Sequence, residues 1–197
     1  SEYTGGHCER VPEITMMLAD AVAKTKVGTY KDFSMNDDER YELYLAGWLH
    51  DCGKVATPVH VVDKATKLET IYDRIENVQT RFEVLKRDAE IEFLKKKIVL
   101  IEKGNLKELK KLESKYKDTL DQFEDDLKFV ETSNVGGEFM EKDSQNRIKN
   151  IGKYTWNFKG KNKPFLSDLE VRNLTIPKGT LLPEERKIIN DHIVITI

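Results

Sequence analysis

Two long charged segments, residues 71–103 and 105–132, most strongly limit what this chain can fold into. Their apolar residues are Ile71, Ile75, Val78, Phe82, Leu85 and Ala89 in the first, and Leu106, Leu109, Tyr116, Leu120, Phe123, Leu127 and Val130 in the second. Alternating steps of three and four residues between charged flanks predict two helices that pack on each other like a coiled coil. The short Gly104-Asn105 link favours an antiparallel hairpin. The sequence therefore predicts an all-α fold with a long helical arm.

Further helices are predicted on both sides of this arm. The expected elements are a helix over 8–25, a helix over 36–50, a short helical turn over 58–63 and a last helix from an N-cap at Thr180 to Ile197. Residues 133–178 are broken by glycines and a proline and are not assigned, although 154–158 can form a short strand or an extended loop. The apolar, uncapped end at 193–197 leads us to expect that the natural protein continues.

Composition excludes several classes of function. The 197 residues carry a net charge of −2, so no strongly basic surface is available for a nucleic-acid polymer. The two cysteines, Cys8 and Cys52, form no CxxC motif, and this usage fits a reducing, cytoplasmic compartment. No apolar run approaches the length of a membrane span, so no membrane contact is expected of this segment.

The five residues His50-Asp51-Cys52-Gly53-Lys54 carry the most specific chemistry. They follow an apolar run, which places His50 and Asp51 at the end of a predicted helix. An imidazole nitrogen beside a carboxylate oxygen can hold a divalent metal ion. Gly53 lets the chain leave the helix, and Lys54 provides a cation where a phosphate can bind. This combination predicts metal-assisted hydrolysis of a phosphate ester.

Two further histidines lie where they can join this pair. His7 lies just before the helix predicted over 8–25, and His192 lies on the last helix, beside an apolar stripe. Three helices that pack side by side can bring such imidazoles to one point. His60 has no comparable setting, and we predict that it is not a ligand.

Five sequence blocks, in this order, resemble an HD-GYP domain. They are Thr4–Val11, Leu49–Lys54, Val62–Leu68, Leu174–Leu181 and Glu184–His192. The family is a branch of the HD phosphohydrolases: all-helical bacterial domains with two or three metal ions, which commonly hydrolyse cyclic di-GMP and act as output modules of sensor proteins. The resemblance implies an HD-domain helical bundle into which the arm is inserted. The implied segments are the first part of the domain (1–71), the helical hairpin (72–132), an irregular insertion (133–172) and the continuing, truncated domain (173–197).

The resemblance also assigns roles to residues. The implied metal ligands are His7, His50, Asp51 and His192; the implied catalytic residues are Asp51 and Lys54; and the implied phosphate-binding residues are Lys54, Lys64 and Lys67. Asp51 would bridge two divalent ions, with iron or manganese expected and magnesium, nickel or zinc as alternatives. The position of a glutamate that some members use for a third ion is occupied by Tyr3, with Glu2 one residue out of register, so two ions are expected.

Three further features of the family would follow residue 197. They are the motif that gives the family its name, a pair of histidines and another aspartate ligand. We therefore expect a cyclic di-GMP phosphodiesterase that is incomplete here, poorly active alone, and fused to a sensor domain, which can belong to a membrane protein with this part in the cytoplasm. One alternative is another HD-type nucleotide phosphohydrolase. The other is a non-catalytic signalling module that forms a homodimer through its arm, in which Leu109, Tyr116, Phe123 and Val130 recur at sevenfold spacing.

Overall fold

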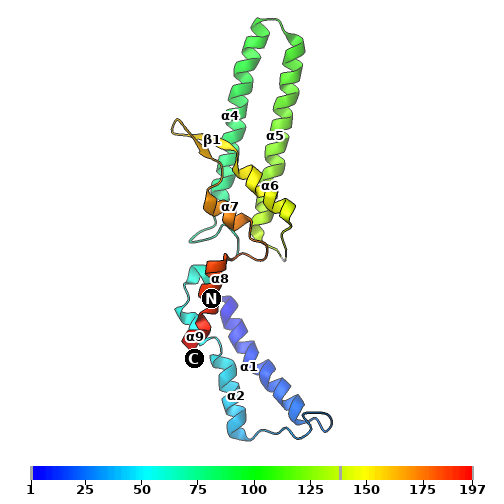
Figure 1. The fold of residues 1–197 in the computed structure, drawn as a ribbon, viewed down its shortest axis with the longest axis vertical. Coiled ribbons are helices and arrows are strands. Elements are labelled where there is room, and N and C mark those ends of the chain that lie inside the picture. Colours follow the sequence, from blue (N-terminus) through cyan, green and yellow to red (C-terminus); the bar gives the residue numbers. More distant parts are fainter. Residues whose placement is uncertain (1, 138, 197) are drawn as a thin grey trace. The chain divides into compact units, whose positions relative to one another are not determined.

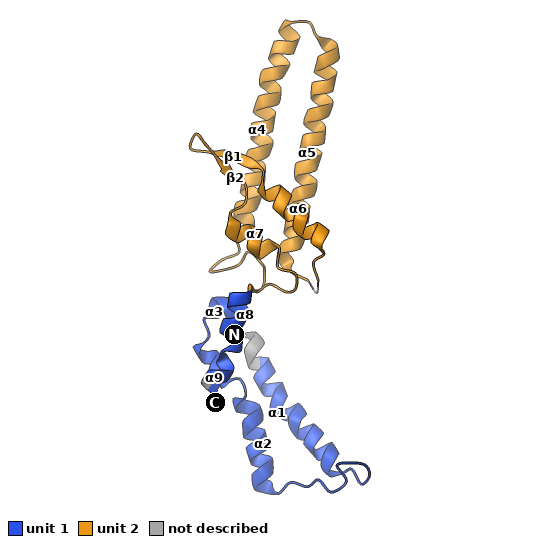
Figure 2. Cartoon of the chain, viewed as in Figure 1, with its two compact units in different colours: residues 1–63, 183–197 blue, residues 64–182 orange. Residues whose placement is uncertain are grey.

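The computed structural model describes residues 2–137 and 139–196, which form two compact units (Figure 1). Unit 1 comprises residues 1–63 and 183–197, and unit 2 comprises residues 64–182 (Figure 2). Both units are mostly helical, which confirms the predicted helical class. The finer assignments, an HD-domain bundle with the arm inserted in it and boundaries at 71/72, 132/133 and 172/173, stay predictions.

Unit 1 contains two longer helices and several short ones. Its elements are α1 (Glu2–Ala23), α2 (Asp37–Leu49), the 3-10 helix η1 (Cys52–Ala56), α3 (Val59–Val62), α8 (Pro183–Asn190) and α9 (His192–Thr196). Asn36 starts α2 as predicted: its side chain accepts from the backbone N–H of Glu39, and the Glu39 carboxylate accepts from the Asn36 N–H. Helices α1 and α2 approach closely at Gly47, where a Cβ atom would lie 3.0 Å from the Cα atom of Pro12.

The apolar side of α2 is less covered than the sequence pattern predicts. The apolar pattern of residues 36–50 predicts that Tyr41, Tyr44, Leu45, Trp48 and Leu49 face a core, but all except the half-buried Leu45 are exposed. The reason is that α2 packs mainly on α1, and the described part of unit 1 holds few fully buried apolar side chains, such as Ala19 and Val61.

Unit 2 contains the two long helices and a compact base. Its elements are α4 (Ile75–Glu102), α5 (Leu106–Val135), α6 (Lys142–Gly152), the antiparallel strands β1 (Thr155–Phe158) and β2 (Lys161–Pro164), and α7 (Asp168–Leu174). Gly104 has a φ of 66°, and Asn105 caps α5 by accepting from the Glu108 N–H. The core lies at the base, where Phe82 packs edge-to-face on Phe165 with ring centroids 4.6 Å apart.

Two parts of the chain differ from the sequence-based expectation. The described residues of 133–178, for which the sequence predicts no regular element, contain the end of α5, then α6, a β-hairpin and α7, and the stretch 154–158 contains β1. The last helix is divided into α8 and α9 at Asp191, and it begins at Pro183. Thr180 is not its N-cap, because the helix begins three residues later, and the Thr180 hydroxyl donates to the Lys64 carbonyl at 3.0 Å.

A buried ion pair ties α4 to α7 in the base of unit 2. Arg81 Nη2 donates to Glu170 Oε1 at 2.6 Å, and Nη1 donates to Oε2 at 3.0 Å. The Ser167 N–H donates to the same Oε2 at 2.8 Å. Burial alone raises the pKa of the Glu170 carboxyl, but the hydrogen bonds from Arg81 and Ser167 outweigh it and hold that pKa below its ordinary value.

We predict that Glu170 makes unit 2 sensitive to acid. A carboxyl whose pKa is lowered by folding contributes stability above its unfolded value, about 4.3, and that contribution disappears as the pH falls through the folded value. Glu170→Gln should lower the free energy of unfolding at neutral pH by about 3 kcal/mol, because it leaves Arg81 buried without a counter-charge. It should also flatten the acid limb of the profile in urea denaturation.

The control is Glu92→Gln, because Glu92 pairs with Lys95 at 3.4 Å on the exposed surface of α4. Exposed pairs contribute little, so its effect should stay within about 0.5 kcal/mol. Equal losses for the two variants would contradict a special role for the buried pair.

Candidate metal centre

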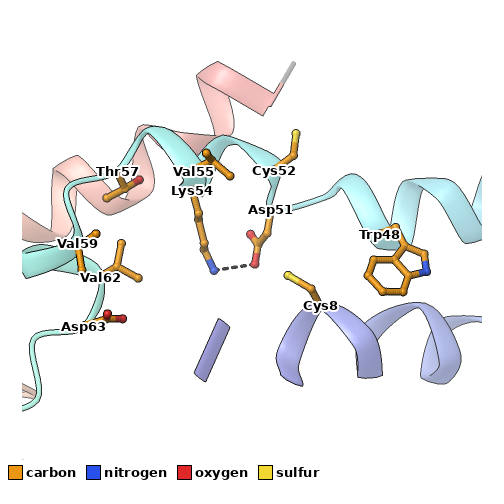
Figure 3. A pocket seen from close by; sticks show the side chains of 10 residues that line it. All are labelled: Cys8, Trp48, Asp51, Cys52, Lys54, Val55, Thr57, Val59, Val62 and Asp63. Atoms are coloured by element: carbon orange, nitrogen blue, oxygen red, sulfur yellow. Dashed lines mark hydrogen bonds and ion pairs between the residues drawn. The ribbon is translucent and has the colours of Figure 1, made fainter. Parts of the chain in front are cut away.

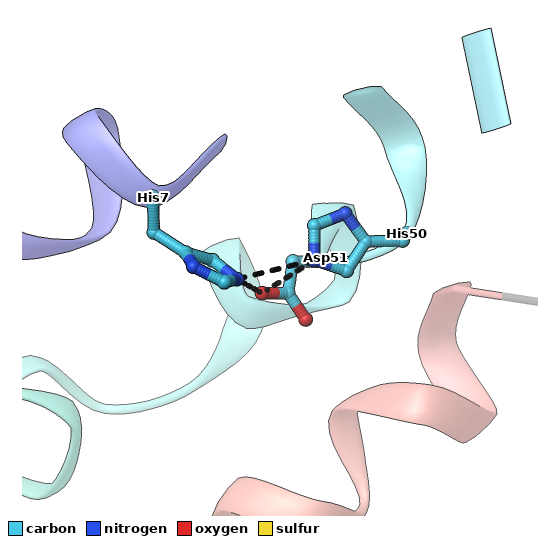
Figure 4. A group of neighbouring side chains, drawn as sticks. All are labelled: His7, His50 and Asp51. Carbon is cyan, nitrogen blue, oxygen red and sulfur yellow. Dashed lines mark hydrogen bonds and ion pairs between the residues drawn. The ribbon is translucent and has the colours of Figure 1, made fainter. Parts of the chain in front are cut away.

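The candidate site in unit 1 is built around the carboxylate of Asp51, which is 8% exposed and directly follows the C-terminus of α2. The oxygen Oδ2 lies 3.1 Å from His50 Nε2 and 3.5 Å from His7 Nε2 (Figure 4). The other oxygen, Oδ1, lies 3.1 Å from His192 Nε2. Imidazoles from α1, from the end of α2 and from α9 therefore surround one carboxylate, each presenting the same ring nitrogen.

Main-chain carbonyls orient two of these rings. His50 Nδ1 lies 2.6 Å from the Gly47 carbonyl oxygen, and His192 Nδ1 contacts the Ile189 carbonyl oxygen. Each carbonyl can only accept, so each Nδ1 carries the proton, and in the neutral ring Nε2 keeps its lone pair. That lone pair faces a carboxylate oxygen 3.1 Å away. Two acceptors at this distance repel each other unless a proton or a metal cation lies between them.

His7, His50 and Asp51 together can hold a metal ion. The Nε2 atoms of His7 and His50 are 3.4 Å apart, and each faces Asp51 Oδ2. Two ligand atoms about 2.1 Å from one ion, at angles between octahedral and tetrahedral, lie roughly 3.0 to 3.4 Å apart. The three separations match this range closely enough that a modest rotation of side chains would complete the coordination.

Asp51 has the ionisation state that a metal ligand needs. Burial alone raises the pKa of its carboxyl, but the hydrogen bond from Lys54 Nζ, 2.6 Å from Oδ2, lowers it. The positive charge of Lys54 lowers it further, as do His50 and His192 in their protonated forms, and the net pKa lies below the ordinary aspartate value. Asp51 is therefore a carboxylate at neutral pH and can accept from more than one direction.

The structure separates the predicted site residues into two groups. His7, His50, Asp51, Lys54 and His192 come together in unit 1. Lys64 and Lys67 belong to unit 2 and are buried there. Lys64 Nζ donates to Asn173 Oδ1 at 2.9 Å, and Lys67 Nζ donates to the carbonyls of Leu174 and Ile176 at 3.1 and 2.9 Å.

Burial lowers the pKa of the Lys67 ammonium, which caps the end of α7. The phosphate contact predicted for Lys64 and Lys67 therefore has no support in the arrangement of their side chains. His60, predicted not to be a ligand, is exposed on α3.

Sequence reasoning missed the contacts that hold His192 in place. A Cβ atom at Gly53 would lie 2.1 Å from the His192 carbonyl oxygen, so only glycine allows α9 to lie this close to η1. The Gly53 N–H donates to Thr196 Oγ1 at 3.0 Å, and that hydroxyl donates to the His192 carbonyl at 3.0 Å. The glycine after the His-Asp pair was the available signal, but it was interpreted only as a helix end.

A cavity of about 290 Å³ opens beside Asp51 (Figure 3). It is lined by Cys8, Trp48, Asp51, Cys52, Lys54, Val55, Thr57, Val59, Val62 and Asp63. The Asp51–Lys54 ion pair lies on its wall, and Trp48, which was expected in a core, contributes an aromatic ring. The site thus combines a charged, metal-compatible wall with apolar walls that can hold an organic group.

No family model, curated protein or solved structure matches this chain significantly. Among the described residues, no helix combines the length and the apolar character that a transmembrane segment requires.

We predict that Gly53→Ala weakens metal binding without a change in any ligand. The added methyl must push α9 away from η1, and His192 moves with α9. Calorimetric titration with Mn²⁺ should show a loss of affinity of roughly 10- to 100-fold, the usual effect of disturbing what orients a ligand. Gly137→Ala is the matched control, because a Cβ atom there meets nothing within 4 Å. Unchanged binding by a folded Gly53→Ala protein would remove His192 from the site.

Proposed function

We propose that unit 1 carries the catalytic centre of a metal-dependent phosphohydrolase. One observation supports this most: both oxygens of the buried Asp51 carboxylate face imidazole Nε2 atoms, and the Lys54 ammonium lies beside them. Burying a carboxylate beside three imidazoles costs free energy, and bound cations would offset that cost. The adjacent cavity gives a substrate access to these groups.

The residues fit two divalent ions. His7, His50 and Asp51 Oδ2 would hold one ion, and Asp51 Oδ1 with His192 would provide part of a second site. Aspartate suits this bridging position because each of its oxygens can serve a different cation. Bound divalent ions supply Lewis acidity and hydroxide at neutral pH, which is the chemistry that phosphate-ester hydrolysis needs. Iron or manganese is proposed, with magnesium, nickel or zinc as alternatives.

The Lys54 ammonium could serve either Asp51 or a phosphate bound in the adjacent cavity. Its ammonium now donates to Asp51 Oδ2, the oxygen that also faces His7 and His50. A cation on that oxygen would repel the ammonium, and the flexible lysine side chain would let it move along the wall of the cavity. There it can donate to a non-bridging phosphate oxygen and stabilise the charge that develops during hydrolysis.

The substrate we propose is a cyclic dinucleotide, in the manner of cyclic di-GMP. The sequence resemblance to HD-GYP domains favours this substrate. The cavity adds the aromatic ring of Trp48 and the carboxylate of Asp63, groups that can stack on a base and accept from its amino group. Hydrolysis of another nucleotide by an HD-type site is the alternative, because the same metal and phosphate contacts would serve it.

Metal content tests the centre itself. The 197-residue chain should bind Mn²⁺, and Asp51→Asn should lose both the metal and any hydrolysis of the diester bis(p-nitrophenyl) phosphate. Asp63→Asn is the control: the residue lines the same cavity but does not belong to the His7–His50–Asp51 group. The proposal fails if the wild-type chain binds no metal, or if Asp51→Asn binds it as well as the wild type does.

Lys54→Met tests the phosphate contact. Loss of one charged donor should lower kcat by about 100- to 1,000-fold and leave the metal content unchanged. Parallel assays with cyclic di-GMP, linear dinucleotides and mononucleotides compare the two substrate classes. Turnover of simple nucleotides with none of cyclic di-GMP would favour the alternative, and unchanged kcat would exclude the phosphate role of Lys54.

A further inference from the structure

The inner face of the helical arm is occupied within the chain. Tyr116 of α5 stacks on Phe93 of α4 with ring centroids 4.4 Å apart, and Val130 is fully buried at the base. Phe123 packs against the core of unit 2. The sevenfold series that ends at Val130, which the sequence offered as a dimer interface, is therefore engaged by the arm itself.

A different apolar stripe lies exposed on the distal half of α4. Its members are Ile91, Leu94, Ile98 and Ile101, each between 47% and 57% exposed. Their spacing of three, four and three residues gives the a, d, a and d positions of a heptad repeat. Figure 1 shows α4 and α5 running side by side to the turn at Gly104.

We infer that this stripe pairs with the same stripe of a second copy of the chain, with the two α4 helices parallel. Isoleucine at both a positions, Ile91 and Ile98, with leucine at the first d position, Leu94, favours a two-stranded parallel coiled coil, and the second d position is Ile101. This interface rests on residues of unit 2 alone, so it does not depend on the function proposed for unit 1.

The charges beside the stripe support both the partner and the direction. In a parallel pair, a residue at position g faces the residue five positions later on the other helix. Glu90 then faces the partner's Lys95, and Lys97 faces the partner's Glu102. Both contacts pair opposite charges. The two-fold symmetry of the dimer repeats each contact on the other side of the helix–helix interface.

An antiparallel pair lacks this complementarity. Opposing the same four apolar residues head to tail places Ile91 against the partner's Ile101 and Leu94 against the partner's Ile98. Lys95 would then lie near the partner's Lys95, and Lys97 near the partner's Lys97. Repulsion between these lysines disfavours the antiparallel arrangement.

The pairing is expected to be weak. Four half-exposed aliphatic side chains on each copy form an interface well below the standard size of about 1,600 Å². Both lysines already have a partner within their own arm: Lys97 pairs with Glu113 at 3.1 Å and Lys95 with Glu92 at 3.4 Å, so each contact across the seam competes with an intrachain ion pair. The arm is already folded in a single chain, so little ordering cost opposes association.

Sedimentation of the 197-residue chain, from low micromolar to millimolar concentration, measures the association. The wild type should shift from monomer to dimer, and Ile98→Glu should stay monomeric with an unchanged helical circular dichroism spectrum. Val99→Glu is the matched control on the same helix, exposed but outside the stripe. A wild type that stays monomeric, or a dimer abolished by Val99→Glu and kept by Ile98→Glu, overturns the inference.

Two further variants test the direction. In a Cys8→Ser, Cys52→Ser background, oxidation should cross-link Ile98→Cys to itself, because identical a positions meet only in a parallel pair. Glu90→Lys should weaken the dimer, and adding Lys95→Glu should restore it. Cross-linking only between Leu94→Cys and Ile98→Cys chains would show the antiparallel arrangement and overturn the parallel one.

Discussion

The burial of one carboxylate determines the arrangement of unit 1. Asp51 is 8% exposed, and a charge removed from water in this way must be paired. Two of its partners come from residues distant in the sequence, His7 on α1 and His192 on α9, and Lys54 on η1 lies three residues away along the chain. The close approaches at Gly47 and Gly53 serve this pairing, since any larger side chain there would separate the elements that carry the imidazoles.

The two units rely on different physics. Unit 1 concentrates charge in a small volume and buries few apolar side chains, so its polar contacts define its arrangement. Unit 2 has a compact apolar core at the base of α4 and α5, to which the Arg81–Glu170 pair is added. In its distal arm, α4 and α5 are joined by side-chain contacts such as the Phe93–Tyr116 stack and by exposed ion pairs, each of which contributes little to stability.

Sequence patterns predicted the features that depend on neighbours in the chain. The periodicity identified the long helices, and the adjacent His50 and Asp51 led to the centre that the fold assembles. Sequence patterns say less where three-dimensional packing decides. The resemblance assigns Lys64 and Lys67 a phosphate contact, which stays a prediction, while in the fold their ammonium groups donate to Asn173 and to the Leu174 carbonyl of α7. The apolar series on α2 could not show that little would cover it, and β2 is exposed along its whole length, so no buried alternation marks it in the sequence.

Anomalous X-ray scattering from crystals grown with Mn²⁺ tests directly whether Asp51 is a shared ligand. If it is, one manganese peak should contact Asp51 Oδ2, His7 Nε2 and His50 Nε2, and a second peak should lie between Oδ1 and His192 Nε2. A single peak at the first position would remove only the bridging role. Crystals that contain manganese elsewhere and none at Asp51, with the imidazoles donating protons to its oxygens, would contradict the metal centre.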